Sequence, residues 1–105
     1  MEIKNLLEFI DLEHKRIIKY YGSPTKSEEI LTRTVKLGEE FGELCDEILS
    51  FNGDQRKEKM LRYDKQNLSR EFADVMITTL LLAKSMNVDI KKALKKKIEK
   101  INKRY

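Results

Sequence analysis

The chain has 105 residues, of which 38% are charged and 40% are hydrophobic, and its formal net charge is +4. Four glycines, one proline and no tryptophan favour helices over a turn-rich β fold. We expect residues 1–105 to form a single domain, and a domain of this size buries only about two-thirds of its unfolded surface. A second subunit is therefore expected to contribute to its stability.

The sequence shows no sign of export or of membrane insertion. Residues 1–15 mix acids with apolar residues, unlike a signal peptide. The longest apolar stretch, from about Val75 to Ala83, is far shorter than the roughly 20 residues that a membrane-spanning helix needs. The single cysteine, Cys45, has no partner for an intramolecular disulfide. We expect a soluble protein of the cytoplasm with no membrane partner.

Two helices are expected in the first half of the chain. Apolar residues recur at helical intervals from about Ile3 to Tyr20, and again from about Glu28 to Phe51. Between these segments, residues 21–27 concentrate turn formers and hold the only proline. Thr25 or Ser27 is the expected cap of the second helix.

Two further helices are expected in the second half. Residues 52–54 should end the preceding helix, and the polar segment 55–65 is expected to be a mobile connector or a frayed helix. The next helix, from about Asn67 to Met86, carries apolar residues around nearly its whole circumference, and such a helix is normally buried. Asp89 is expected to cap a last helix that begins at Ile90. The predicted architecture is all-α and resembles a four-helix bundle.

One face of the second predicted helix is crowded with acids. At 100° per residue, five acidic side chains project within an arc of roughly 120°. They are Glu39, Glu40, Glu43, Asp46 and Glu47. Taken alone, such a face is more often simply solvated, and Lys36 offsets the repulsion only partly.

Two acids of the third predicted helix change that balance. Glu71 and Asp74 are three residues apart and share one face of an otherwise apolar helix. Burying an unpaired carboxylate costs several kcal/mol, so these acids need protonation, a basic partner or a metal ion. A salt bridge between Arg70 and Asp74 is the simpler alternative, although it leaves the acids of the preceding helix unexplained.

If the two acidic helices pack antiparallel, their faces converge and present four carboxylates to one place. Oxygen ligands of this kind select Mg²⁺, with Mn²⁺ as a substitute. The only histidine, His14, and the only cysteine do not lie at the spacing of a zinc site. The chain also lacks a glycine-rich phosphate loop, so a metal and lysines would have to hold any phosphate groups.

The run Glu39-Glu40-Phe41-Gly42-Glu43, followed by Glu71-Phe72-Ala73-Asp74, resembles the EExxE and ExxD motifs of MazG-type all-α nucleotide pyrophosphohydrolases. The resemblance extends from about Leu37 to Tyr105 and includes the lysine-rich end. EExxE alone is common in helical proteins, whereas its pairing with ExxD in this order is fairly specific. The resemblance implies Mg²⁺-dependent hydrolysis of nucleoside triphosphates, either dNTPs or non-standard NTPs, to the monophosphate and pyrophosphate. Such a hydrolase has a house-cleaning role in the nucleotide pool.

The resemblance also implies roles for individual residues. The positions of the family's metal ligands are occupied here by Glu40, Glu43, Glu71 and Asp74. Glu39 is then the catalytic candidate that orients or deprotonates the attacking water. Lys97 matches a lysine that contacts the substrate in family members. An asparagine is expected four residues later, where this chain has Ile101, so Asn102 is the candidate for that contact and Arg104 is a further substrate-binding candidate.

Base recognition is less well defined, because family members use aromatic side chains that include tryptophan, which this chain lacks. The candidates for stacking are His14, Tyr20, Tyr21 and Phe51. Ordinary packing is the more frequent role for such residues.

Two other functions remain open. The segment from Lys91 to Arg104 carries eight basic residues and one acid, as in a non-enzymatic module that binds nucleic acid or another partner. Aromatic residues that stack on bases are absent there apart from Tyr105, so nucleic acid is not the expected partner. The second alternative is a superfamily enzyme acting on another pyrophosphate, such as phosphoribosyl-ATP or a dUTPase substrate.

The apolar helix from about Asn67 to Met86 needs more burial than one chain of four helices supplies. We therefore expect a homodimer or homotetramer, in which residues of a neighbouring subunit can complete the active site.

Overall fold

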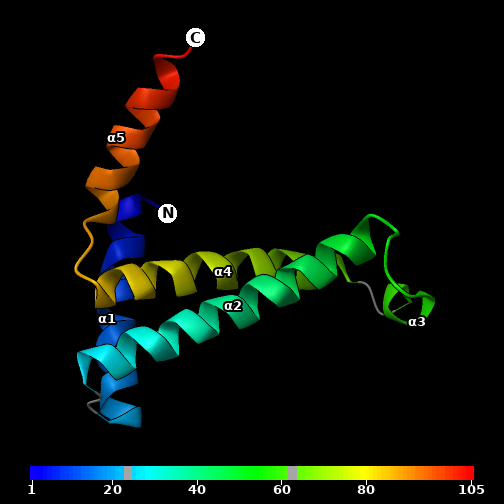
Figure 1. Cartoon of the computed structure of the whole chain (residues 1–105), viewed down its shortest axis with the longest axis horizontal. Helices are drawn as coiled ribbons and strands as arrows, with labels where there is room; N and C mark the ends of the chain where they lie inside the picture. Colours follow the sequence, from blue (N-terminus) through cyan, green and yellow to red (C-terminus); the bar gives the residue numbers. More distant parts are fainter. Residues whose placement is uncertain (23–24, 62–63) are drawn as a thin grey trace. The chain divides into compact units, whose positions relative to one another are not determined.

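The structure is a computed structural model that describes residues 1–22, 25–61 and 64–105. Ser23 and Pro24, in the predicted loop, and Arg62 and Tyr63, in the predicted connector, lie outside the described residues. The helices are α1 (Ile3–Tyr21), α2 (Lys26–Phe51), α3 (Lys57–Met60), α4 (Lys65–Ser85) and α5 (Ile90–Asn102) (Figure 1). The all-α prediction is confirmed. None of the described helices is both long and apolar enough to cross a membrane.

Two helices begin at caps that the sequence predicts. Thr25 caps α2, because its Oγ1 accepts a hydrogen bond from the Glu28 amide at 3.2 Å. Asp89 caps α5, because its carboxylate accepts a hydrogen bond from the Lys92 amide at 3.1 Å. Each bond satisfies an amide that the first turn of a helix leaves without a partner.

Two helices also end as the turn-forming residues predict. Gly53 follows α2 with a φ of 78°, and Asn87 follows α4 with a φ of 55°. This left-handed conformation suits glycine and is tolerated by asparagine. After Asn87, the Val88 amide donates to the Ala83 carbonyl at 3.0 Å and closes the end of α4.

The described chain forms two compact units, and the first comprises Met1–Ile30 and Leu80–Tyr105. It contains α1, α5 and the adjoining ends of α2 and α4. Ile10 of α1 is its buried hydrophobic side chain, with 3% of its surface exposed. By contrast, nearly all of α5 is exposed, including its apolar residues Leu94 and Ile98.

The second unit comprises Leu31–Thr79 and is built on α2 and α4, which run side by side in opposite directions (Figure 1). Leu44 of α2 is buried. On α4, however, Phe72 is 48% exposed and Met76 is 60% exposed. A single chain therefore leaves part of this apolar helix exposed, as expected for a helix that needs more burial than one chain supplies, because packing against one long helix covers only one face.

The polar connector is partly helical. α3 forms a single turn, as expected for a frayed helix. Two contacts tie this region to α2, because Gln55 donates to Asp46 Oδ1 at 2.9 Å and the Lys59 ammonium lies 3.3 Å from Asp46 Oδ2. The connector is thus attached to the second half of α2 by polar contacts.

Candidate metal centre

Three of the four predicted metal ligands meet between α2 and α4. Glu40 and Glu43 of α2 and Glu71 of α4 each offer a carboxylate oxygen, and these oxygens lie within 4.8 Å of one another. The spacing of three residues places Glu40 and Glu43 on one face of α2, and the antiparallel α4 brings Glu71 opposite them. The predicted convergence of the two acidic helices is therefore observed for these three residues.

The three acids of this cluster differ in exposure. Glu40 is buried, Glu71 is partly buried and Glu43 is exposed. The Oε2 atoms of Glu40 and Glu71 are both buried, and neither has a hydrogen-bond partner among the described residues. Leaving a buried acceptor unpaired costs about 1–3 kcal/mol, and more when it is charged. These oxygens therefore fit a hard divalent cation, which prefers carboxylate ligands.

The crowding raises the pKa of Glu71 above its ordinary value. Burial is the largest cause, and the negative charges of Glu43, Asp74 and Glu40 add to it. Each of these effects favours the protonated form when no cation is present. A bound cation has the opposite effect, because positive charge favours the carboxylate.

Lys36 is the basic side chain tied to this cluster. Its ammonium lies 3.1 Å from Glu40 Oε1 and 3.6 Å from Glu39 Oε2. The hydrogen bond to Glu40 raises the pKa of Lys36 and keeps it charged. Within the described part of the chain, Glu43 and Glu71 form no ion pair, so one lysine faces at least three acids.

The fourth predicted ligand, Asp74, lies one turn after Glu71 on α4. Its side chain is exposed, and it acts on the cluster through the effect of its charge on the pKa of Glu71. The proposed salt bridge with Arg70 is not found among the described residues. Arg70 instead donates to Asn67 Oδ1 at 2.8 Å and to Gln66 Oε1 at 3.4 Å. The described contacts of Arg70 therefore do not support this salt bridge.

A family model of the MazG nucleotide pyrophosphohydrolase domain matches residues 28–105, which include both acidic motifs. The chain belongs to this family. No curated protein and no solved structure matches it. Membership of the MazG family supports a nucleotide pyrophosphohydrolase activity and agrees with the acidic cluster between α2 and α4.

Glu47 is a further acid on the same stripe of α2, one turn beyond Glu43. Its Oε2 is buried and has no hydrogen-bond partner among the described residues. From the sequence, Glu47 belongs to the acidic face of this helix and has no separate role. The signal was present in the spacing of Glu40, Glu43 and Glu47, which places all three on one side of the helix.

The predicted substrate-binding residues belong to the first unit. They are Lys97 and Asn102 on α5 and Arg104 just after it, and all are exposed. Their exposure leaves them accessible to a phosphate group, and their role remains a prediction.

The candidate stacking residue His14 lies beside the buried acid Glu29. Its Nδ1 lies 3.5 Å from Glu29 Oε1, while the Lys26 ammonium lies 2.9 Å from Glu29 Oε2. Tyr20 and Tyr21 are exposed and line a hollow of about 360 Å³ in the same unit. Their role in base recognition remains a prediction.

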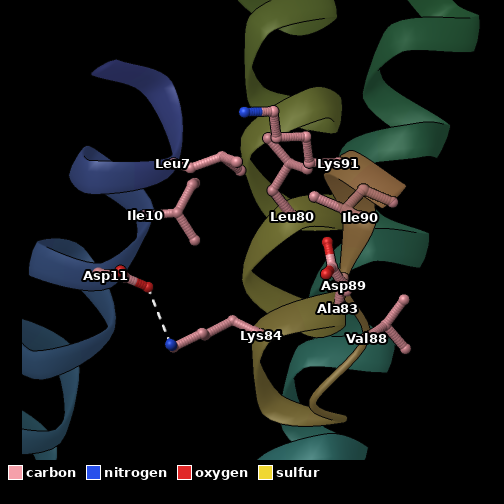
Figure 2. Close-up of a pocket in the computed structure, with 10 residues that line it drawn as sticks. All are labelled: Leu7, Ile10, Asp11, Leu80, Ala83, Lys84, Val88, Asp89, Ile90 and Lys91. Carbon is pink, nitrogen blue, oxygen red and sulfur yellow. Dashed lines mark ion pairs between the residues drawn. The ribbon is translucent and has the colours of Figure 1, made fainter. Parts of the chain in front are cut away.

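A mostly apolar cavity of about 200 Å³ also lies in the first unit. Figure 2 shows Leu7 and Ile10 of α1 on one side of it and Leu80 of α4 on the other. At its rim the Lys84 ammonium lies 2.9 Å from Asp11 Oδ1, and this hydrogen bond lowers the pKa of Asp11 (Figure 2). None of the predicted site residues lines this cavity.

Proposed function

We propose that the protein hydrolyses nucleoside triphosphates, either dNTPs or non-standard NTPs, to the monophosphate and pyrophosphate in the cytoplasm. In this proposal Mg²⁺, or Mn²⁺ in its place, is held by the four acids of the two motifs. These are Glu40, Glu43, Glu71 and Asp74. The observation that carries the proposal is the meeting of EExxE and ExxD acids in a chain of the MazG family, where the buried Oε2 atoms of Glu40 and Glu71 have no hydrogen-bond partner among the residues that the structure describes.

A divalent cation supplies positive charge that orients the triphosphate and stabilises the charge that develops on the departing pyrophosphate. Glu40 and Glu71 contribute buried oxygens to hold it, and Glu43 contributes an exposed one. Asp74, which is exposed and lies one turn after Glu71, is the fourth ligand in this proposal. Four carboxylates are sufficient to offset both the cation and the nearby Lys36.

Glu39 acts as the general base in this proposal. It is exposed beside the cluster, and the Lys36 ammonium lies 3.6 Å from its Oε2. The water oxygen bonds to the α phosphorus while the bond from that phosphorus to the α–β bridging oxygen breaks. Glu39 accepts the proton that the water loses. Lys97, Asn102 and Arg104 are the proposed contacts to the substrate.

The test is an assay of common and modified NTPs with Mg²⁺, with Mn²⁺ and with EDTA, in which both products are identified. We expect equal amounts of the monophosphate and pyrophosphate, and no turnover in EDTA. Phosphoribosyl-ATP and dUTP belong in the same panel, because they are the substrates of the alternative superfamily activities. Absence of turnover with every nucleotide would contradict the proposal.

A homodimer or homotetramer is the second part of the proposal. Phe72 and Met76 lie one turn apart on α4 and are about half exposed, and Val35 of α2 is 63% exposed. Exposed apolar groups of this size are typical of surfaces that a partner covers. Light scattering should show an oligomer, and the substitution Phe72→Asp should weaken it. Leu94→Asp, which changes an exposed apolar residue of the first unit, is the variant for comparison. A wild-type monomer at micromolar concentration would contradict this part.

A further inference from the structure

Lys36 contacts two residues of the site and has no role in the chemistry described above. It lies one turn before Glu40 on α2, and its ammonium is 3.1 Å from Glu40 Oε1. The other oxygen of Glu40, Oε2, is buried and has no hydrogen-bond partner among the described residues. The two oxygens of the Glu40 carboxylate thus differ, because Oε1 contacts an ammonium group and Oε2 has no such contact among the described residues.

We propose that Lys36 is a positioning residue that restricts Glu40 to binding the cation through one oxygen and holds Glu39 beside it. This inference rests on the proposed function. A carboxylate can bind a hard cation through one oxygen or through both. The ammonium competes with a cation for Oε1, which leaves the buried Oε2 as the favoured oxygen of Glu40 for a cation shared with Glu43 and Glu71.

The restriction has a consequence for the reaction. A cation that receives one oxygen from Glu40 keeps a position open for water or for a phosphate oxygen of the substrate. The same ammonium limits the directions in which the exposed Glu39 carboxylate can point. Lys36 therefore affects the rate at which the bound substrate is hydrolysed more than it affects the binding of the substrate.

A direct contact between Lys36 and the substrate is the competing role. The side chain is 57% exposed, so a phosphate group can reach it. A phosphate ligand contributes to binding in the ground state, and its removal raises KM. A positioning residue instead lowers kcat and leaves KM nearly unchanged.

The first experiment counts the water molecules around Tb³⁺ bound in the site, from its luminescence lifetime in H₂O and in D₂O. Tb³⁺ is a hard cation with the same preference for oxygen ligands. Lys36→Met should lose about one water relative to the wild type, because Glu40 then binds through both oxygens. Lys36→Arg retains the positive charge and should keep the wild-type number. An unchanged number in Lys36→Met would overturn the proposal.

The matched control is Lys59→Met. The Lys59 ammonium also pairs with an acid of α2, at 3.3 Å from Asp46 Oδ2, but it does not contact Glu39 or Glu40. This variant should keep both the number of waters and the turnover of the wild type. A loss of water in Lys59→Met equal to that in Lys36→Met would overturn the assignment to Lys36.

The second experiment measures steady-state turnover of the best nucleotide at saturating Mg²⁺. In Lys36→Met, kcat should fall at least about tenfold while KM stays within about threefold of the wild type. Lys36→Arg should recover part of the loss. A rise in KM with unchanged kcat would overturn the proposal in favour of a phosphate contact. If the wild type turns over no nucleotide, the proposed function fails, and the water count alone decides the role of Lys36.

Discussion

Glu29 and Glu40 are both buried acids of α2, each with 7% of its surface exposed, but the charges around them differ. Glu29, in the first unit, has the Lys26 ammonium 2.9 Å from one oxygen and His14 Nδ1 3.5 Å from the other. Glu40, in the second unit, has Lys36 at one oxygen, while its other oxygen has no hydrogen-bond partner in the described part of the chain and two more carboxylates lie close by.

The difference separates a structural acid from a candidate ligand. A buried carboxylate between basic side chains has its desolvation offset by its neighbours and holds the fold together. A buried carboxylate that faces other carboxylates opposes the fold unless a cation joins them. Burial alone does not distinguish the two cases, whereas the charge of the neighbours does.

Glu40→Gln should have the largest effect on activity. The amide keeps the shape of the side chain but removes the charge that the cation needs, so turnover should fall at least about 1000-fold. The cation-free protein should remain helical and should unfold no more easily, because repulsion with Glu43 and Glu71 is relieved. Pyrophosphate release and chemical denaturation in EDTA are the measurements. Turnover within tenfold of the wild type would exclude Glu40 as a ligand.

Glu29→Gln should show the opposite pattern. The change leaves Lys26 and His14 without their shared carboxylate, which should lower the free energy of unfolding by roughly 1–3 kcal/mol. Turnover well below the unfolding temperature should stay at the wild-type level. Denaturation in urea measures the stability, and an unchanged midpoint would show that the pair does not hold the fold.

The cation-free protein should lose stability as the pH rises above 4.5, the ordinary pKa of the Glu71 side chain. Because the folded state raises this pKa, it binds more protons than the unfolded state between the two values, and the free energy of unfolding falls across that window. The loss is complete once the pH passes the raised pKa. Thermal unfolding in EDTA at a series of pH values measures the effect.

Glu71→Gln is the control for this pH dependence, since it removes the titrating group and should flatten the curve. Saturating Mg²⁺ should also flatten it in the wild type, because the cation replaces the proton. Identical pH curves for the wild type and Glu71→Gln through this window would contradict the crowding of acids around Glu71.

Lys84→Met should have the smallest effect. It breaks the pair with Asp11 at the rim of the apolar cavity, where both side chains are about half exposed (Figure 2). Exposed pairs contribute little, so the midpoint of thermal unfolding should shift by less than about 5 °C and turnover should not change. A larger shift would show that the Lys84–Asp11 pair, like the contacts of Glu29, contributes substantially to the stability of the fold.

Local features of the fold could be predicted from the sequence. The helices follow the apolar periodicity, and Thr25 and Asp89 cap α2 and α5 as expected. Such features depend on residues within one or two turns of each other. The convergence of acids on α2 and α4 could also be predicted, because antiparallel packing is the simplest arrangement of two acidic faces.

The relative burial of the acids could not be predicted. The apolar circumference of α4 favoured Glu71 and Asp74 as the buried pair, with the acids of α2 on a solvated face. In the structure Glu40 is buried and Asp74 is exposed. Burial depends on which face the neighbouring helix covers, and no periodicity within one helix contains that information.

The corner between α4 and α5 has a consequence for the order of folding. Asn87 turns the chain in the left-handed conformation, Val88 closes the end of α4, and Asp89 begins α5 with its side-chain cap. Every one of these contacts joins residues fewer than six positions apart, so closing them requires little loss of chain entropy. We expect this corner to form within microseconds, before the distant acids of α2 and α4 meet.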